Sequence, residues 1–149
     1  MTDNLSPEDL GIDLSTGRPQ QLYRWFLASI LFGKPIQQNV SAGTYRVLIE
    51  HGFTSPKKFA AIAREPLRKL LDDGGYGRFD YQMADYLHAT MAAVKSEHGS
   101  VHRMVASARS RADLKKTVKQ FTGIGDTTAR IFTDPIPAAV IGTRVADSA

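Results

Sequence analysis

Hydrophobic residues recur every three to four positions along the chain, and no stretch alternates apolar and polar residues as a half-exposed strand does. This spacing predicts an all-α fold. The segment 21–32 is apolar on nearly all sides, so we expect it to be the central buried helix. A longer helix is expected to start with Asp80 as its cap and to end near His98, because four apolar residues fall on one helical face, namely Met83, Leu87, Met91 and Val94.

Prolines and glycines predict the other helix boundaries, since proline fits a first helical turn and glycine often follows a last one. Ser6-Pro7-Glu8 indicates a short helix that stops near Gly11, and Pro35 indicates a helix that ends near Gly52. We also expect short helices at 55–63, 65–72, 100–108 and 112–119, with a flexible break over 72–80. The chain is predicted to form a single helical domain that consists of an N-terminal segment (1–20), a helical core (21–133) and an irregular tail (134–149).

Composition narrows the classes of protein that fit. The 149 residues include no cysteine, which excludes disulfides, thiolate zinc sites and an iron–sulfur cluster held by the chain itself. The four histidines have no metal-ligand spacing, so no metal site built from side chains is expected. No apolar run approaches the roughly 20 residues of a membrane span, and the N-terminus lacks a signal-peptide pattern. We expect an intracellular, cytoplasmic protein with no membrane partner.

The positive charge is concentrated in one region. The formal net charge is +4, and the stretch from Lys95 to Arg130 contains eight basic and only three acidic residues. Such a local excess is typical of a surface that binds a polyanion. If that polyanion is DNA, the protein would be associated with the nucleoid.

The same region contains the sequence QFTGIGDTTARIF, residues 120–132, with Gly123 and Gly125 between two short apolar helical faces. Two glycines permit a tight turn with positive φ and let a foreign surface approach the backbone. The first amides of the second helix would then point outward and form an anion site, with Asp126 as an N-cap or first-turn residue. Nearby groups that could bind the same anion are Thr127, Thr128, Arg130, Lys115, Lys116 and Lys119.

This motif resembles the helix-hairpin-helix element of the base-excision DNA glycosylase superfamily, in which apolar-x-Gly-apolar-Gly-x-x-Thr/Ser-Ala corresponds to FTGIGDTTA. Upstream, LYRWFLASILFG followed by PIQQNVSAGTYRVL, and GYGRFDYQMADYL, are similar to helices of the same fold. The resemblance implies a hairpin at 121–126 that grips the DNA backbone without sequence specificity through Gly123, Ile124 and Gly125. It also implies duplex DNA with a damaged base as the partner, a flipped nucleotide, and a monovalent cation at the hairpin carbonyls, with no other cofactor.

The sequence departs from this family at its catalytic positions. Members with lyase activity carry a lysine where this chain has Thr127, so lyase chemistry by that residue is not expected. The family's catalytic aspartate has two candidates, Asp147 and Asp134. Three hypotheses therefore stay open: a DNA-binding protein of repair type, an active monofunctional glycosylase, or a helical protein-interaction module. In the family that this chain resembles, the flipped nucleotide enters a pocket between two lobes. A partner chain that completes the second of these lobes is a further alternative.

Overall fold

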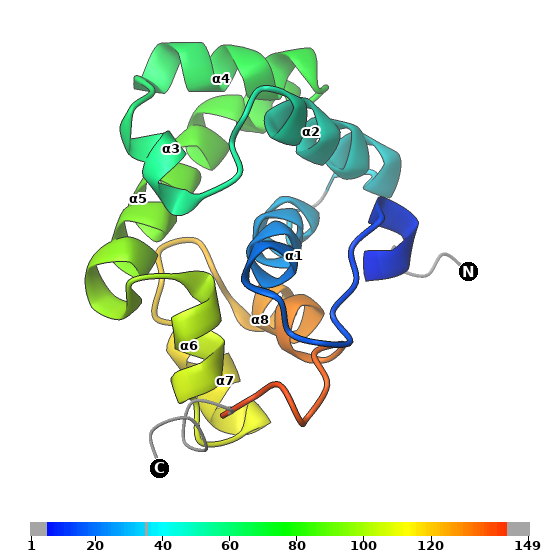
Figure 1. The fold of residues 1–149 in the computed structure, drawn as a ribbon. Coiled ribbons are helices and arrows are strands. Elements are labelled where there is room, and N and C mark those ends of the chain that lie inside the picture. The colour runs from blue at the N-terminus through cyan, green and yellow to red at the C-terminus, as the bar shows by residue number, and fades with distance from the viewer. Residues whose placement is uncertain (1–5, 35, 143–149) are drawn as a thin grey trace.

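All regular structure is helical in the computed structural model of the protein, which describes residues 6–34 and 36–142. Figure 1 shows the helices arranged around α1. Within the described ranges, the chain forms two 3-10 helices and eight α-helices, which are η1 (Pro7–Leu10), α1 (Pro19–Phe32), α2 (Gln38–Glu50), α3 (Pro56–Ala60), α4 (Arg64–Asp73), η2 (Gly77–Phe79), α5 (Asp80–His98), α6 (Val101–Ser107), α7 (Arg111–Val118) and α8 (Asp126–Thr133). The predicted all-α class is confirmed.

Helix α1 is the centre of the core, as its apolar sequence predicts. It contacts α2, α6 and α8, and ten of its fourteen residues are buried. The indole Nε1 of Trp25 donates a hydrogen bond to the Phe132 carbonyl at 3.1 Å, which fixes α1 to α8. Because Trp25 is 2% exposed, this bond satisfies a polar group that would otherwise be buried without a partner.

Several predicted boundaries need correction. Helix α2 begins at Gln38 instead of Pro35, which lies outside the described residues. Helix α3 is shorter than predicted and covers only Pro56–Ala60. Asp80 is the first residue of α5, and Phe79 holds the N-cap position. One carboxylate oxygen of Asp80 accepts from the Tyr81 amide at 2.6 Å and the other from Arg68 at 2.9 Å.

The predicted break over 72–80 is anchored to the core. Tyr76 is 2% exposed, and its hydroxyl donates to the Leu31 carbonyl at 2.5 Å. Gly75 adopts φ +104°, a left-handed conformation that favours glycine, and Tyr76 is the N-cap of η2. The glycines in this segment therefore bring a buried tyrosine back to α1. The predicted break is confirmed as an interruption between α4 and α5, while its flexibility stays a prediction.

The irregular tail packs against the core as far as it is described. Ile136 and Val140 are buried, and Val140 lies so close to Gly17 that a Cβ on this glycine would be 2.6 Å from the valine. The Gly142 amide donates to the Val105 carbonyl at 3.1 Å. The tail therefore covers the lower part of the helical assembly in Figure 1.

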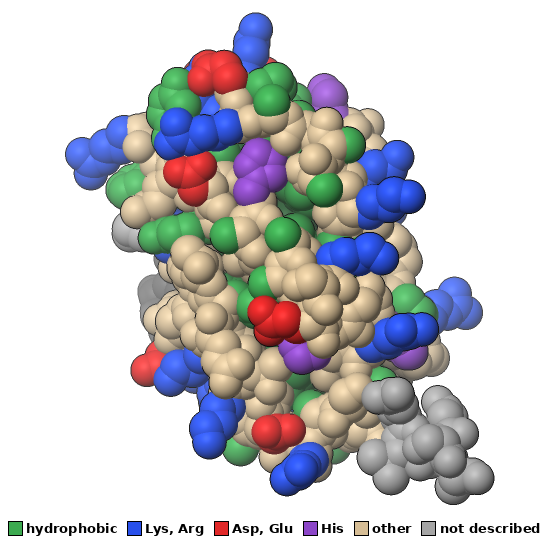
Figure 2. All heavy atoms as spheres, turned by 90° about the vertical axis from the view of Figure 1, so that its left-hand side faces the viewer, with side chains coloured by type: hydrophobic (Ala, Val, Ile, Leu, Met, Phe, Trp, Pro, Cys, Tyr) green, Lys and Arg blue, Asp and Glu red, His purple; other side chains and the backbone are tan. Residues whose placement is uncertain are grey.

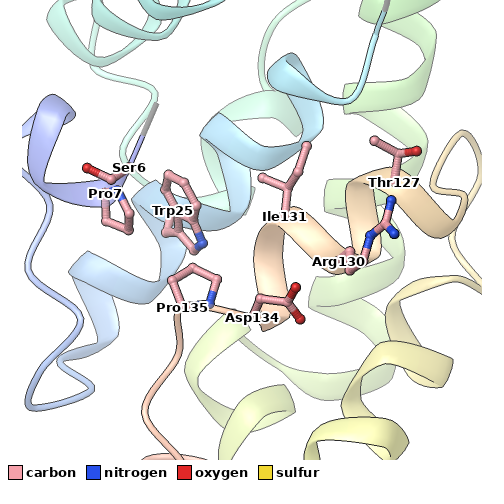
Figure 3. A pocket seen from close by; sticks show the side chains of 8 residues that line it. All are labelled: Ser6, Pro7, Trp25, Thr127, Arg130, Ile131, Asp134 and Pro135. Carbon is pink, nitrogen blue, oxygen red and sulfur yellow. The ribbon is translucent and has the colours of Figure 1, made fainter. Parts of the chain in front are cut away.

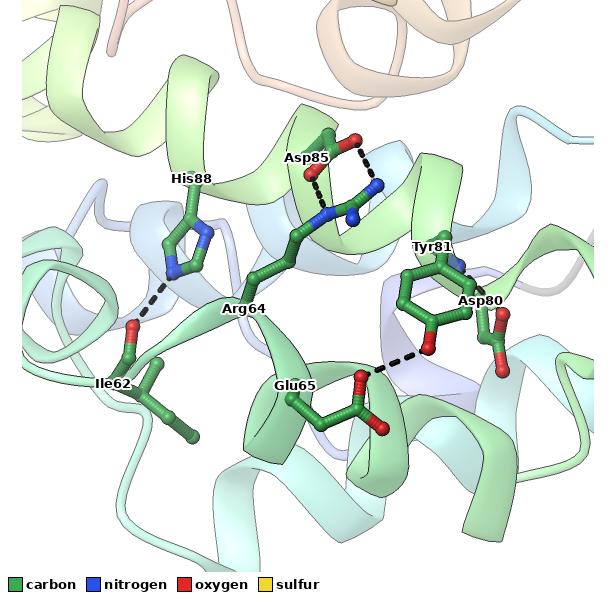
Figure 4. A network of polar contacts seen from close by, with 7 residues as sticks. All are labelled: Ile62, Arg64, Glu65, Asp80, Tyr81, Asp85 and His88. Atoms are coloured by element: carbon green, nitrogen blue, oxygen red, sulfur yellow. Dashed lines mark hydrogen bonds and ion pairs between the residues drawn. The ribbon is translucent and has the colours of Figure 1, made fainter.

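A polar network joins α4 to α5 on the surface, as Figure 4 shows. Arg64 makes two hydrogen bonds to the Asp85 carboxylate, at 2.8 and 3.0 Å. The Tyr81 hydroxyl donates to Glu65 at 2.8 Å. Hydrogen bonding to Arg64 is the main cause that lowers the pKa of Asp85 below its ordinary value. These contacts hold α4 in place, at the end of the molecule away from α7.

Candidate nucleic-acid interface

The two glycines lie in the turn that connects α7 to α8, here called the glycine turn and defined as residues 119–125. Phe121 in this turn and Phe132 in α8 both contact the ring of Phe26, with ring centroids 6.3 and 5.1 Å apart. Leu114 and Val118 of α7 are buried in the same hydrophobic core. The predicted apolar faces before and after the glycines therefore meet on α1, which leaves the turn at the surface.

The two glycines serve different purposes. Gly123 has φ +83°, and a Cβ at this position would lie 2.6 Å from atoms of the Tyr86 ring. Gly125 has φ −106° and ψ −163°, an extended conformation open to any residue, and nothing lies within 4 Å of the place its Cβ would take. The prediction of positive φ is confirmed for Gly123 and wrong for Gly125. The fold itself gives no reason for glycine at position 125.

The backbone amides of residues 125–128, at the start of α8, have no acceptor within the described part of the chain. Gly125, Asp126 and Thr127 are exposed residues, whereas Thr128 is buried, and no side chain caps the helix. The Ile124 amide differs, because it donates to the Phe121 carbonyl at 3.2 Å. An uncapped helix N-terminus with outward amides favours an anion, through both hydrogen bonds and the helix dipole.

Two of the predicted contact residues have side chains directed inward. Ile124 is 6% exposed and belongs to the hydrophobic core. Thr128 is 5% exposed, and its hydroxyl lies where a Cβ on Gly33 would be. The Thr128 hydroxyl is therefore directed away from the surface on which the sequence analysis places it. Ile124 is predicted to act through its backbone, so its buried side chain does not bear on that prediction. Thr127 and Arg130 are exposed and remain candidates.

The two lysines of α7 and Lys119, the first residue of the glycine turn, lie together on one face beside this turn. Lys115, Lys116 and Lys119 line a hollow of about 270 Å³ with Ala112, as expected for positions i, i+3, i+4 and i+7 of a helix. Lys119 Nζ also forms an ion pair with the Asp126 carboxylate at 2.5 Å. Asp126 is a first-turn residue, as predicted, but its carboxylate pairs with Lys119 instead of capping amides. The Lys119 ammonium lowers the pKa of Asp126 below its ordinary value.

A second hollow follows the outer face of α8 and contains one of the two candidate catalytic aspartates. It has a volume of about 340 Å³, and Figure 3 shows the side chains that line it: Ser6, Pro7, Trp25, Thr127, Arg130, Ile131, Asp134 and Pro135. Asp134 is exposed and follows the last residue of α8. Asp147 lies outside the described residues.

Arg111, the first residue of α7, has a structural role at the C-terminus of α8. Its Nη1 donates to the Thr133 carbonyl and, at 3.3 Å, to the Asp134 carbonyl. A cation at a helix C-terminus satisfies free carbonyls and favours the dipole. Arg111 therefore stabilises α8 and is not one of the cations beside the glycine turn.

Helix α5 packs against the glycine turn through two residues that were not among the predicted site residues. The Tyr86 ring lies against Gly123, and one helical turn later the buried Thr90 hydroxyl donates to the Thr122 carbonyl at 3.1 Å. The spacing i, i+4 places both residues on one face of α5. The sequence gives a weak signal for this contact. Tyr86 and Thr90, spaced i, i+4, lie next to the apolar face of α5.

Basic side chains also occur elsewhere on the molecule. Figure 2 shows the side of α3, α5 and α6, where lysines and arginines surround a face that also carries acidic and histidine side chains. No group of three or more histidine, aspartate or glutamate side chains that could hold a metal occurs in the described ranges. None of the helices in these ranges is long and apolar enough to cross a membrane.

A scan against protein-family models finds no match for this chain, and searches of curated proteins and of solved structures find none either. The functional assignment therefore depends on the residues and the geometry described above.

Proposed function

We propose that this protein binds duplex DNA without sequence specificity, and that the glycine turn grips a backbone phosphate as the hairpin of helix-hairpin-helix repair proteins does. The observation that carries the proposal is the start of α8. Exposed amides of Gly125, Asp126 and Thr127 have no acceptor in the described structure, and Gly125 leaves the approach to them open. A phosphate oxygen fits such a site by charge and by hydrogen bonding.

The arrangement of cations favours a polymer over a small phosphate. Lys115 and Lys116 lie on one side of the turn along α7, and Arg130 lies one helical turn into α8. Charges spread along two helices match the repeated phosphates of a nucleic-acid strand. Contacts of this kind position the protein on DNA and carry no sequence information.

The test is a titration of an undamaged duplex at several salt concentrations. Phosphate binding predicts that the logarithm of the affinity falls linearly with the logarithm of the salt concentration, with a slope of about −0.9 for each phosphate contacted. Lys116→Gln should make this slope shallower by about 0.9, while duplexes of different sequence should bind alike. If the chain shows no duplex binding at low salt, it is not a DNA-binding protein. That result would support the hypothesis of a helical protein-interaction module.

The second candidate function is excision of a damaged base by hydrolysis of the N-glycosidic bond. The observation in its favour is the hollow beside α8, where Asp134 lies together with Trp25 and with Thr127, a residue of the proposed DNA surface. A carboxylate there could activate water or stabilise a cationic sugar. Separate Asp134→Asn and Asp147→Asn variants, assayed on a panel of damaged duplexes, test this function: loss of excision with unchanged binding supports it, and no excision by the unmodified chain removes it.

We also propose that a monovalent cation binds at the carbonyls of the glycine turn, as the resemblance implies. Two carbonyls of the turn already accept hydrogen bonds, Phe121 from the Ile124 amide and Thr122 from the Thr90 hydroxyl. A carbonyl oxygen has two lone pairs, so these contacts leave acceptor capacity for a cation. A comparison of duplex affinity in potassium and in tetramethylammonium salts at equal ionic strength would test whether a small cation is required.

A further inference from the structure

One lysine from a distant part of the sequence lies beside the glycine turn. Lys34, in the loop after α1, has its Nζ 4.1 Å from the centre of the Tyr86 ring, the same ring that packs against Gly123. The preceding residue, Gly33, packs against Thr128 in the first turn of α8. These contacts place Lys34 next to the start of α8, although more than eighty residues separate the two segments in sequence.

Lys34 has no counter-charge in the described part of the chain. The ion pairs found there involve other residues. Its side chain is partly buried, and this burial alone lowers the pKa of the Lys34 ammonium below its ordinary value. A partly desolvated cation without an anion is unfavourable for the fold, and groups of this kind are concentrated at functional sites.

We infer that Lys34 is a phosphate-binding residue of the DNA interface, held in place by the Tyr86 ring. The inference rests on the proposed function. The lysines of α7 approach the turn from one helix, and Lys34 approaches it from the loop after α1, so the turn has cations from two separate elements. Each DNA strand carries a phosphate about every 3.4 Å along the helix axis. A strand with one phosphate on the turn amides brings neighbouring phosphates toward both sets of cations.

The experiment compares Lys34→Met and Lys34→Arg with Lys69→Met, a matched control on α4, which Figure 1 places at the opposite end of the molecule from α7. Duplex affinity is measured by fluorescence anisotropy across salt concentrations, and thermal stability by circular dichroism. Lys34→Met should weaken binding about tenfold and make the salt slope shallower by about 0.9. Its thermal stability should stay equal or rise, because a partly buried charge is replaced by an apolar group. Lys34→Arg should bind within about twofold of the unmodified chain, since it keeps the charge and the contact with the ring.

Each other outcome has a separate meaning. If Lys34 only anchors Tyr86, Lys34→Met will lower the melting temperature and leave the salt slope unchanged, which overturns the inference. If the unmodified chain binds with a steep salt dependence and Lys34→Met has the slope of Lys69→Met, the inference fails while the proposed function stands. If the unmodified chain does not bind duplex DNA, the proposed function and the inference both fail.

Discussion

The carboxylate of Asp126 lies 2.5 Å from the Lys119 ammonium, across the turn that joins α7 to α8. Asp126 is the first residue of α8, so its negative charge lies beside the free amides that would bind a phosphate. Both side chains are exposed to solvent, and a pair of this kind contributes little to stability. Its expected effect on the binding of an anion is larger. The carboxylate pairs with the Lys119 ammonium, and it also repels any anion at the start of α8.

Removal of this carboxylate should strengthen DNA binding. In Asp126→Asn, Lys119 becomes free for a phosphate and the repulsion at the start of α8 is lost. We expect the affinity for an undamaged duplex to rise about threefold to tenfold at low salt, and the salt slope to become steeper by about 0.9. The melting temperature should change little. Asp113→Asn is the control for removal of one acidic charge from α7, and an equal gain in affinity for both variants would show that only net charge matters.

The two glycines of the turn should respond differently to substitution, and at Gly125 we expect a loss of binding with little loss of stability. Its backbone is extended and the space around its missing Cβ is open. Gly125→Leu should therefore change the free energy of unfolding by less than about 1 kcal/mol. On the proposed function, duplex affinity should fall at least about tenfold, because the side chain would cover the amides proposed to donate to phosphate. Chemical denaturation and anisotropy of the same protein preparation check both values, and unchanged affinity would contradict the proposed role of the turn.

Gly123→Ala tests the opposite case. The alanine would need a left-handed backbone conformation, and its Cβ would be 2.6 Å from the Tyr86 ring. Together these effects should lower the free energy of unfolding by about 2–4 kcal/mol. Urea denaturation measures this loss. A stability equal to that of the unmodified chain would show that the ring is not packed on the turn as described.

The sequence predicts much of this fold because its information is local. The apolar face of α1, the first-turn proline of α3 and the serine before α6 each act within one or two helical turns, and they indicate helices close to those found. Asp80 shows the limit of such reasoning. Its residue type suits a cap, but Arg68, twelve positions away in another helix, binds its carboxylate.

The candidate site was predictable only in part for the same reason. The glycine pair and the lysines of α7 are neighbours in sequence, so their proximity could be expected. The contributions of Tyr86 and Lys34 depend on how α1 and α5 pack around α8, which no local pattern encodes. The inward direction of Thr128 likewise follows from its contact with Gly33 across the core.

The surface network between α4 and α5 should give the stability of the protein a small dependence on pH in acid. The pKa values of Asp85 and Glu65 are lowered, mainly by hydrogen bonds to Arg64 and Arg68 respectively. A carboxylate with a lowered pKa contributes stability above the ordinary carboxyl pKa of the unfolded chain, 3.8 for Asp85 and 4.5 for Glu65. This contribution is lost as the pH falls through the lowered value.

Asp85→Asn should therefore make the melting temperature less dependent on pH below about 4. At pH 7 the variant should melt only slightly lower than the unmodified chain, since the pair with Arg64 is exposed to solvent. Thermal melts recorded by circular dichroism between pH 2 and pH 7 measure both effects. Identical pH profiles for the two proteins would show that this ion pair makes no contribution.

The contact between Gly33 and Thr128 provides a test of how α8 is held against α1. Gly33 has φ −75°, which any residue can adopt, so its requirement for glycine comes from space alone. A Cβ there would collide with the Thr128 hydroxyl and lie 3.0 Å from the threonine Cβ. Gly33→Ala should lower the free energy of unfolding by about 1–3 kcal/mol.

Thr128→Ala should recover part of this loss, because it removes the colliding hydroxyl and leaves the 3.0 Å approach to Cβ and a 3.4 Å approach to the Ser29 carbonyl oxygen. The double variant should therefore be more stable than the sum of the single effects predicts, with a coupling of at least about 0.5 kcal/mol. Urea denaturation of the four proteins in the cycle measures it. Strict additivity would mean that the two residues do not touch, and the placement of Lys34 beside α8 would then rest on its contact with Tyr86 alone.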